Sequence, residues 1–72
     1  SLLLVQLLSH EGTDKESVEN TVSNMIRHMQ WTADFAKKVT RYSVQSGYVK
    51  RQGDQLFLTA YGRENARQLM QI

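Results

Sequence analysis

The sequence predicts a mainly α-helical domain with one small β-hairpin, in the order three helices, two strands and a C-terminal helix. Its 72 residues suffice for one domain, taken to span residues 1–72. Apolar residues recur at helical spacing up to residue 46 and again after residue 59, and two short strand-like segments lie between them. The chain has no cysteine, so neither a disulfide nor a thiolate metal site can support its thin core.

The first helix is predicted over residues 2–9. One face carries four leucines at helical spacing: Leu3, Leu4, Leu7 and Leu8. Leu2 and Val5 lie off that face, so the helix is apolar almost all round and should contact a second surface besides the core. That surface is the last helix, a partner subunit or a preceding segment, and we expect self-association through this helix.

The second helix is predicted over residues 14–29. Thr13 and Glu16 have the spacing of a capping box, in which each side chain accepts a hydrogen bond from the other residue's backbone N–H. An apolar stripe is predicted to face the core: Val18, Val22, Met25, Ile26 and Met29. The opposite face is predicted to be exposed: Glu19, Asn20, Ser23, Asn24 and Arg27.

The third helix is predicted over residues 32–46. Thr32 is a good N-cap, Asp34 suits the positive end of the helix dipole, and Gly47 can end the helix in the left-handed conformation. One face is expected to pack inward: Phe35, Ala36, Val39, Tyr42 and Ser43. The other face is polar: Lys37, Lys38, Arg41 and Gln45. Trp31, just before this helix, is expected to close the core across the turn.

Two strands are predicted at residues 48–50 and 55–58, on either side of a turn at 51–54 in which Gly53 supplies a positive φ. The expected inward anchors are Val49, Leu56 and Leu58. Thr59 then caps a last helix that runs to the end of the chain. Gly62, Ala66 and Leu69 share one face of that helix, and Gly62 predicts close packing against another helix.

This order of elements is that of a winged helix-turn-helix. The likeness includes Met29, Thr32 opening a helix, Gly47-Tyr48-Val49 after it, and Leu58-Thr59 followed by Gly62-Arg63-Glu64 and Ala66. In these residues the chain resembles the N-terminal DNA-binding domain of the diphtheria toxin repressor family of metal-dependent regulators. The resemblance implies a DNA-binding module of a transcription regulator. It does not imply metal sensing, because that family's metal-sensing regions lie mostly beyond such a domain.

A second resemblance points elsewhere. The segment His28-Met29-Gln30-Trp31 is similar to the cytoplasmic C-terminal extension of some manganese, zinc or iron ABC transporter permeases. This resemblance implies a regulatory or protein-interaction domain appended to a membrane transporter, with the first helix continuing from a membrane helix or packing on a sister domain.

The charge distribution favours DNA as the partner. Residues 1–30 carry two cations and four carboxylates, a net charge of −2, whereas residues 31–72 carry seven cations and three carboxylates, a net charge of +4. We expect helix 32–46 to enter the major groove as the recognition helix and the hairpin 48–58 to follow the backbone as the wing. The predicted DNA contacts are Thr32, Asp34, Lys37, Lys38, Arg41, Lys50 and Arg51. The alternative is that these cations only form a solvated face.

Other chemistry has little support in the sequence. His10, Glu11 and His28 could suggest a metal site, but their spacing matches no known one, and we expect no metal or other cofactor. A cysteine nucleophile and a glycine-rich phosphate loop are both absent, so we expect that the chain is not an enzyme. The apolar run at residues 2–8 is far shorter than the roughly 20 residues that cross a bilayer, and no signal peptide is evident, so we expect a cytoplasmic location.

Overall fold

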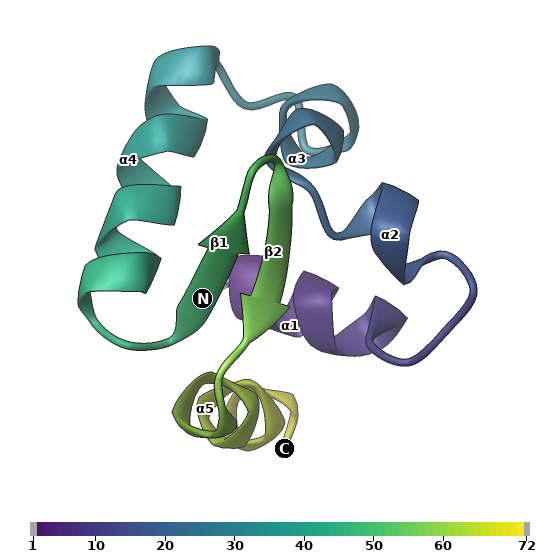
Figure 1. Cartoon of the computed structure of the whole chain (residues 1–72). Coiled ribbons are helices and arrows are strands. Elements are labelled where there is room, and N and C mark those ends of the chain that lie inside the picture. The colour runs from purple at the N-terminus through teal and green to yellow at the C-terminus, as the bar shows by residue number, and fades with distance from the viewer. Residues whose placement is uncertain (1, 72) are drawn as a thin grey trace.

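Helices at both ends enclose a single antiparallel hairpin in the computed structural model, which describes residues 2–71 (Figure 1). The elements are α1 (Leu2–His10), α2 (Glu16–Glu19), α3 (Val22–His28), α4 (Ala33–Gln45), β1 (Val49–Gln52), β2 (Gln55–Leu58) and α5 (Ala60–Met70). The prediction of a mainly helical chain with one small hairpin is therefore confirmed. Ser1 and Ile72, at the ends of the predicted domain, lie outside the described residues.

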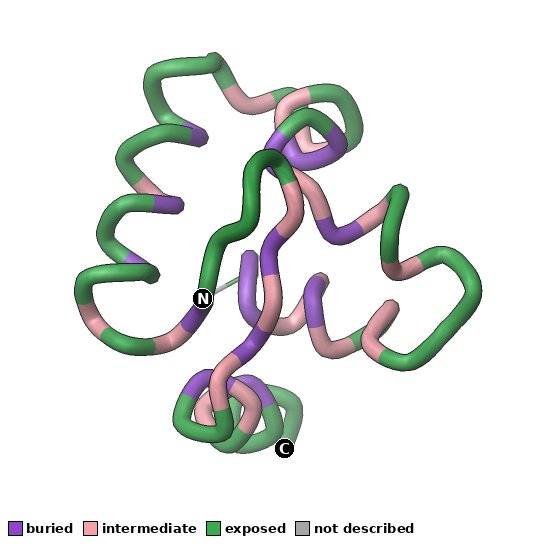
Figure 2. Tube along the Cα trace, in the orientation of Figure 1, coloured by how far each residue is buried: buried purple, intermediate pink, exposed green. Residues whose placement is uncertain are grey.

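The hairpin lies at the centre of the molecule. β2 supplies the core with alternate side chains, and β1 supplies Val49. β1 and β2 pair in a register that sets Val49 opposite Leu58 and Gln52 opposite Gln55. The predicted anchors Val49, Leu56 and Leu58 are all buried, as Figure 2 shows for alternate positions of β2. The turn is tighter than predicted, because Arg51 and Gln52 belong to β1 and Gly53, with φ at +59°, begins the reversal.

Two helices, α1 and α5, pack against the hairpin and shield its apolar side chains from water. α1 runs behind β2 and buries Leu3, Leu4 and Leu7, while Leu8 is half-buried against the same cluster. α5 crosses the open end of the hairpin and packs on α1 (Figure 1). A lone two-stranded hairpin is marginally stable in water, so these helices are what stabilise it.

The predicted continuous helix over residues 14–29 is wrong: the chain leaves the helical conformation at Asn20 and Thr21. Here the backbone pairs with β2 instead. The Asn20 carbonyl accepts from the Leu56 N–H at 2.8 Å, and Thr21 forms a β-bridge with Gln55. A second bond runs from the Val22 N–H to the Asp54 carbonyl at 2.9 Å, and the two bonds together make the bridge. Thr21, in extended conformation, therefore lies along the edge of β2.

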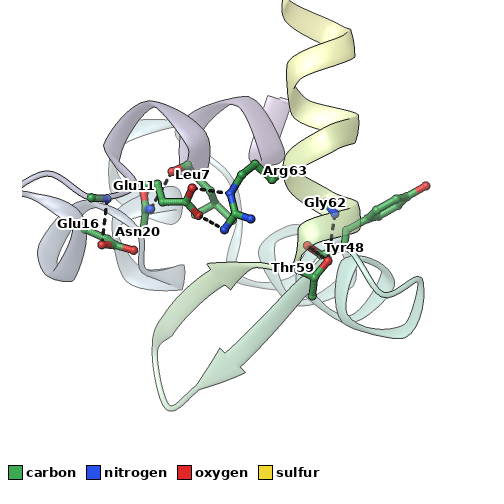
Figure 3. A network of polar contacts seen from close by, with 9 residues as sticks. Leu7, Glu11, Glu16, Asn20, Tyr48, Thr59, Gly62 and Arg63 are labelled. Carbon is green, nitrogen blue, oxygen red and sulfur yellow. Dashed lines mark hydrogen bonds and ion pairs between the residues drawn. The ribbon is translucent and has the colours of Figure 1, made fainter.

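Two asparagines that were predicted to be exposed are buried at this break. Asn20 donates its side-chain amide to the Leu7 carbonyl of α1 at 2.9 Å (Figure 3). Asn24 donates its amide to the Glu19 carbonyl at the end of α2, at 2.8 Å. Leu7 lies in the last turn of α1 and Glu19 ends α2, so both carbonyls are among those that a helix end leaves without an intrahelical partner. The two buried amides therefore satisfy carbonyls at the ends of α1 and α2.

The break also changes how α2 begins and which way it faces. Thr13 accepts from the Lys15 N–H, and the Glu16 carboxylate accepts from the Gly12 N–H, so the predicted reciprocal capping box does not form. The helix begins at Glu16 rather than Asp14. Val18 is 63% exposed and is not part of the core, because the four-residue α2 does not continue the stripe of α3. Val22 and Met25 of that stripe are buried, as predicted.

α4 has the predicted ends but a different buried face. The Thr32 hydroxyl accepts from the Phe35 N–H at 3.1 Å, and Gly47 follows the helix with φ at +81°. The buried residues are the small ones, Ala36, Thr40 and Ser43, on the side of α4 toward the hairpin (Figure 2). The prediction that Phe35 and Tyr42 pack inward is wrong, since they are 49% and 64% exposed. Small side chains let α4 lie close to β1.

α5 begins where predicted, and its first turn packs directly against backbone. The Thr59 hydroxyl accepts from the Gly62 N–H at 3.0 Å and donates to the carbonyls of Gly47 and Tyr48 (Figure 3). A Cβ on Gly62 would lie 1.9 Å from the Tyr48 carbonyl oxygen. The neighbour is thus the backbone entering β1, rather than the predicted helix. Leu69 is exposed, and α5 ends at Met70, whereas the predicted final residue 72 lies outside the described part.

One ion pair ties the two ends of the chain together. Arg63 of α5 donates from Nε and Nη2 to the two carboxylate oxygens of Glu11, at 2.7 and 2.9 Å (Figure 3). The hydrogen bond from Arg63 lowers the pKa of Glu11 below its ordinary value of 4.5. A bidentate pair of this kind fixes orientation as well as distance, so it sets how α1 meets α5.

We expect Gly62→Ala to destabilise the domain by about 2 kcal/mol or more, because the new methyl group overlaps a backbone carbonyl that cannot rotate away. Helix propensity alone would give the opposite sign, a gain of roughly 0.5–1 kcal/mol. Urea unfolding followed by circular dichroism measures the change. Glu64→Ala, at an exposed position of α5, is the control and should stay near the native midpoint. A Gly62→Ala midpoint at or above the native one would contradict the contact.

We expect Glu11→Gln to cost roughly 0.5–1.5 kcal/mol at neutral pH, because it removes the charged acceptor of a partly exposed pair. The folded-state pKa of Glu11 is lowered, so its contribution is complete above pH 4.5 and is lost as the pH falls through the lower folded value. Urea unfolding of both proteins at several pH values should therefore show curves that converge in acid. A constant difference between them at all pH values would mean that the charge is not responsible.

Candidate nucleic-acid interface

A tight turn between α3 and α4 sets the direction of α4. α3 ends at His28, Gln30 adopts a left-handed φ of +57°, and Thr32 opens α4 in extended conformation. Trp31 between them is partly buried against the core and meets the Phe35 ring edge-on, with the centroids 5.1 Å apart. The prediction that Trp31 closes the core across this turn is confirmed. The turn sets α4 beside the hairpin (Figure 1), and the residues of its polar face are exposed.

All seven predicted DNA-contacting residues lie at exposed positions. They divide into an α4 group, Thr32, Asp34, Lys37, Lys38 and Arg41, and a β1 group, Lys50 and Arg51. Thr32 and Asp34 mark the start of α4, where the Thr32 hydroxyl already accepts from the Phe35 N–H. Lys37 and Arg41 follow one and two turns later on one flank, and Lys38 lies farther round the helix.

Three of the seven residues meet in one groove. Its volume is about 610 Å³, and it lies between α3, α4 and β1. Lys37 and Arg41 line it from α4, and Arg51 lines it from β1. Lys50 lies outside this groove and lines a second hollow of about 730 Å³, between the hairpin and the end of α4, which Arg51 shares. Thr32, Asp34 and Lys38 line neither hollow.

The groove also has an apolar side that the sequence did not predict as part of any site. Val22 and Ile26 of α3 and Val44 of α4 line it. The apolar stripe correctly placed Val22 in the core, but it gave no sign that a groove would pass over it. To predict the groove, one would have to know where β1 lies relative to α3. That position follows from the backbone pairing at Thr21. Gln45 of the polar face also reaches the groove.

The cations of this face are not neutralised by neighbouring carboxylates. Within residues 2–71, the ion pair between Glu11 and Arg63 is the one found, and it lies away from the groove. Arg51 donates from Nε to the Gly53 carbonyl at 2.7 Å, which holds the guanidinium near the hairpin turn. Asp54, next in the turn, accepts instead from the Ser23 N–H at 3.2 Å, at the start of α3. The face therefore keeps a positive charge available to a partner.

The three residues considered for a metal site do not come together. The Glu11 carboxylate binds Arg63, and His10 Nδ1 lies 3.2 Å from the Gln6 carbonyl of the preceding turn. His28 is exposed at the end of α3. Across residues 2–71, no group of three or more histidine, aspartate or glutamate side chains could hold a metal ion. Among the helices of this same range, none has the length and apolar character needed to cross a membrane.

Comparison with protein families, with characterised proteins and with solved structures finds no match to this chain. The function must therefore be argued from the geometry and charge of the face formed by α4 and β1.

We expect Gln30→Gly to stabilise the domain by about 0.5 kcal/mol, since a left-handed φ costs an L-residue roughly 1–2 kcal/mol and glycine loses part of that gain as chain entropy. Gln30→Val should destabilise it, because a β-branched side chain tolerates this φ poorly. Urea midpoints of the two variants, measured side by side, give the order. If valine proved as stable as glycine, the turn would not have the left-handed conformation.

Proposed function

We propose that this chain is a winged helix-turn-helix domain that binds duplex DNA, with α4 as the recognition helix and the β1–β2 hairpin as the wing. The observation that carries the proposal is the convergence of Lys37 and Arg41 of α4 with Arg51 of β1 on one groove. Two separate elements thus present cations to the same partner. A polyanion with a regular backbone, such as duplex DNA, is the partner that suits this arrangement.

The dimensions of α4 support this role. Its 13 residues give a length of about 20 Å, and a helix of this width fits the major groove of B-DNA. Its inner face is held by Ala36, Thr40 and Ser43, so the outer face can enter the groove without loss of packing. The short turn through Gln30 and Trp31 joins it to α3, as in a helix-turn-helix.

Each predicted residue has a role in this proposal. Lys37, Lys38 and Arg41 contact phosphates or guanine edges in the major groove. Lys50 and Arg51 contact the phosphate backbone beside it. Thr32 and Asp34 lie at the start of α4, the end from which recognition helices contact bases. Asp34 would accept a hydrogen bond from the amino group of cytosine and repel a nearby phosphate, so it favours specificity over affinity.

A single module of this size buries a modest area on DNA, so we propose that two copies act together. Leu2 of α1 is 63% exposed and Phe35 of α4 is 49% exposed, and both line one apolar hollow of about 270 Å³. By helical spacing, Phe35 lies on the flank of α4 opposite Lys37 and Arg41. This hollow extends the self-association surface predicted for the first helix and leaves the basic face open.

We expect the 72-residue chain to enrich a defined site, with two-fold symmetry, from a pool of random duplex DNA. Replacing Lys37, Arg41 and Arg51 by glutamine should weaken binding. It should also reduce the slope of log affinity against log salt, by about 0.9 for each phosphate that the variant no longer neutralises. Fluorescence anisotropy at several salt concentrations measures both quantities.

The matched control replaces three exposed cations elsewhere, Lys15, Arg27 and Arg67, by glutamine and so has the same net charge. It should keep nearly native affinity and slope. Equal losses in both triple variants would mean that only net charge matters. No enrichment, with binding lost at physiological salt, would overturn the proposal and favour the domain of a transporter permease that contacts protein.

A further inference from the structure

The apolar side of the groove is not needed for binding a phosphate backbone. Cations alone serve that purpose, yet Val22, Ile26 and Val44 line the same space as Lys37, Arg41 and Arg51. Val44 is 41% exposed, so its side chain is open to a partner rather than fully used by the core. Apolar surface beside convergent polar groups is the usual composition of a small-molecule site.

The size of the groove agrees with such a site. Its volume of about 610 Å³ lies within the roughly 300–1,000 Å³ typical of ligand pockets. Residues from α3, α4 and β1 line it, so a ligand there would touch three consecutive elements of the chain. The hairpin register and the backbone pairing of Thr21 fix β1 relative to α3, and α4 packs against both, so the site is formed before a ligand arrives.

The charges of the groove select the kind of ligand. Lys37, Arg41 and Arg51 are its charged lining residues, and its lining includes no carboxylate. Within residues 2–71, none of the three forms an ion pair. An uncharged ligand would leave these cations without a partner, and a cation would be repelled. Charge complementarity therefore calls for a ligand with an anionic group and an apolar body.

We propose that the groove binds a small amphipathic anion, with its aromatic or aliphatic body against Val22, Ile26 and Val44 and its carboxylate, sulfonate or phosphate among Lys37, Arg41 and Arg51. Because the proposed function assigns the same cations to DNA, the small anion and DNA exclude one another. The exclusion rests on the proposed function, whereas binding of the anion does not. The site would thus let a metabolite of this class release the domain from DNA.

The test uses anilinonaphthalene sulfonate, an aromatic sulfonate whose fluorescence rises in apolar surroundings, and its uncharged analogue N-phenyl-naphthylamine. We expect the sulfonate to bind the folded chain at one site and more tightly than the uncharged analogue. Arg41→Gln should weaken sulfonate binding by at least about threefold, since it removes one charged partner. The same variant should leave the weaker binding of the uncharged analogue unchanged.

Lys38→Gln is the matched control, because Lys38 lies on the same helix, is equally exposed and does not line the groove. It should bind the sulfonate as the native chain does. Circular dichroism and urea midpoints confirm that both variants are folded, which separates groove binding from dye binding to loosened chains. Equal affinity of Arg41→Gln and Lys38→Gln for the sulfonate, or no binding to the native chain, would overturn the proposal.

A competition experiment tests the anion site and the proposed DNA-binding function separately. The sulfonate is titrated into the native chain bound to a fluorescein-labelled duplex, and displacement of the duplex at the concentrations that fill the groove is expected. Arg41-dependent sulfonate binding by a chain that does not bind duplex would support the anion site and contradict the DNA-binding function. Firm duplex binding without an Arg41-dependent sulfonate site would support that function and overturn the anion site.

Discussion

The pairing of Asn20 and Thr21 with β2 is the constraint on which the rest of this fold depends. It links the chain before α3 to the hairpin through the Asn20 carbonyl and the Val22 N–H, 2.8 and 2.9 Å from their partners. If these two bonds were lost, two backbone N–H groups and two carbonyls would be left without their partners. The start of α3 is therefore fixed to the end of the hairpin, although the two lie far apart in the sequence. α4 follows from α3 through a turn of a few residues, so its position is determined as well.

This constraint also accounts for the position of the basic groove. α3 is capped from two sides at its first turn, by the Thr21 hydroxyl and by the Asp54 carboxylate of the hairpin turn. The same turn holds Arg51, through its bond to the Gly53 carbonyl. Arg51 is thus held by the same hairpin turn whose Asp54 caps α3. The groove between α3, α4 and β1 is a consequence of these local contacts, and its charge comes from residues that the contacts leave free.

Local signals let the sequence predict most elements and their ends. Thr32 and Thr59 cap helices as expected, Gly47 adopts a positive φ, and Val49, Leu56 and Leu58 are buried. Each of these depends on residues within a few positions of one another. The break at Asn20 could not be found in this way, because helical spacing continues across it from Val18 to Val22 to Met25. What opposes the helix is a pairing with residues 54–56, which no local pattern contains.

The same limit applies to the face formed by α4 and β1. The seven candidate residues could be selected from their type and from the expected polar face of one helix. The sequence could not show which of the seven residues lie together. Lys37 and Arg41 share a groove with Arg51 only because of where the hairpin lies. The apolar residues of the groove were hidden for a related reason. Val22 and Ile26 satisfied the pattern of a core stripe, and a position can line a groove while its other atoms pack inward.

α4 packs against the hairpin with one face and lines the basic groove with another. Its buried strip consists of Ala36, Thr40 and Ser43, whose small side chains let the helix lie close to the hairpin. With larger residues there, α4 would stand farther from β1, and Arg41 and Arg51 would no longer share a groove. The Ser43 hydroxyl donates to the Val39 carbonyl, so burying it leaves no unsatisfied donor. Ser43 does not line the groove, yet its small volume helps to hold the two walls of the groove together.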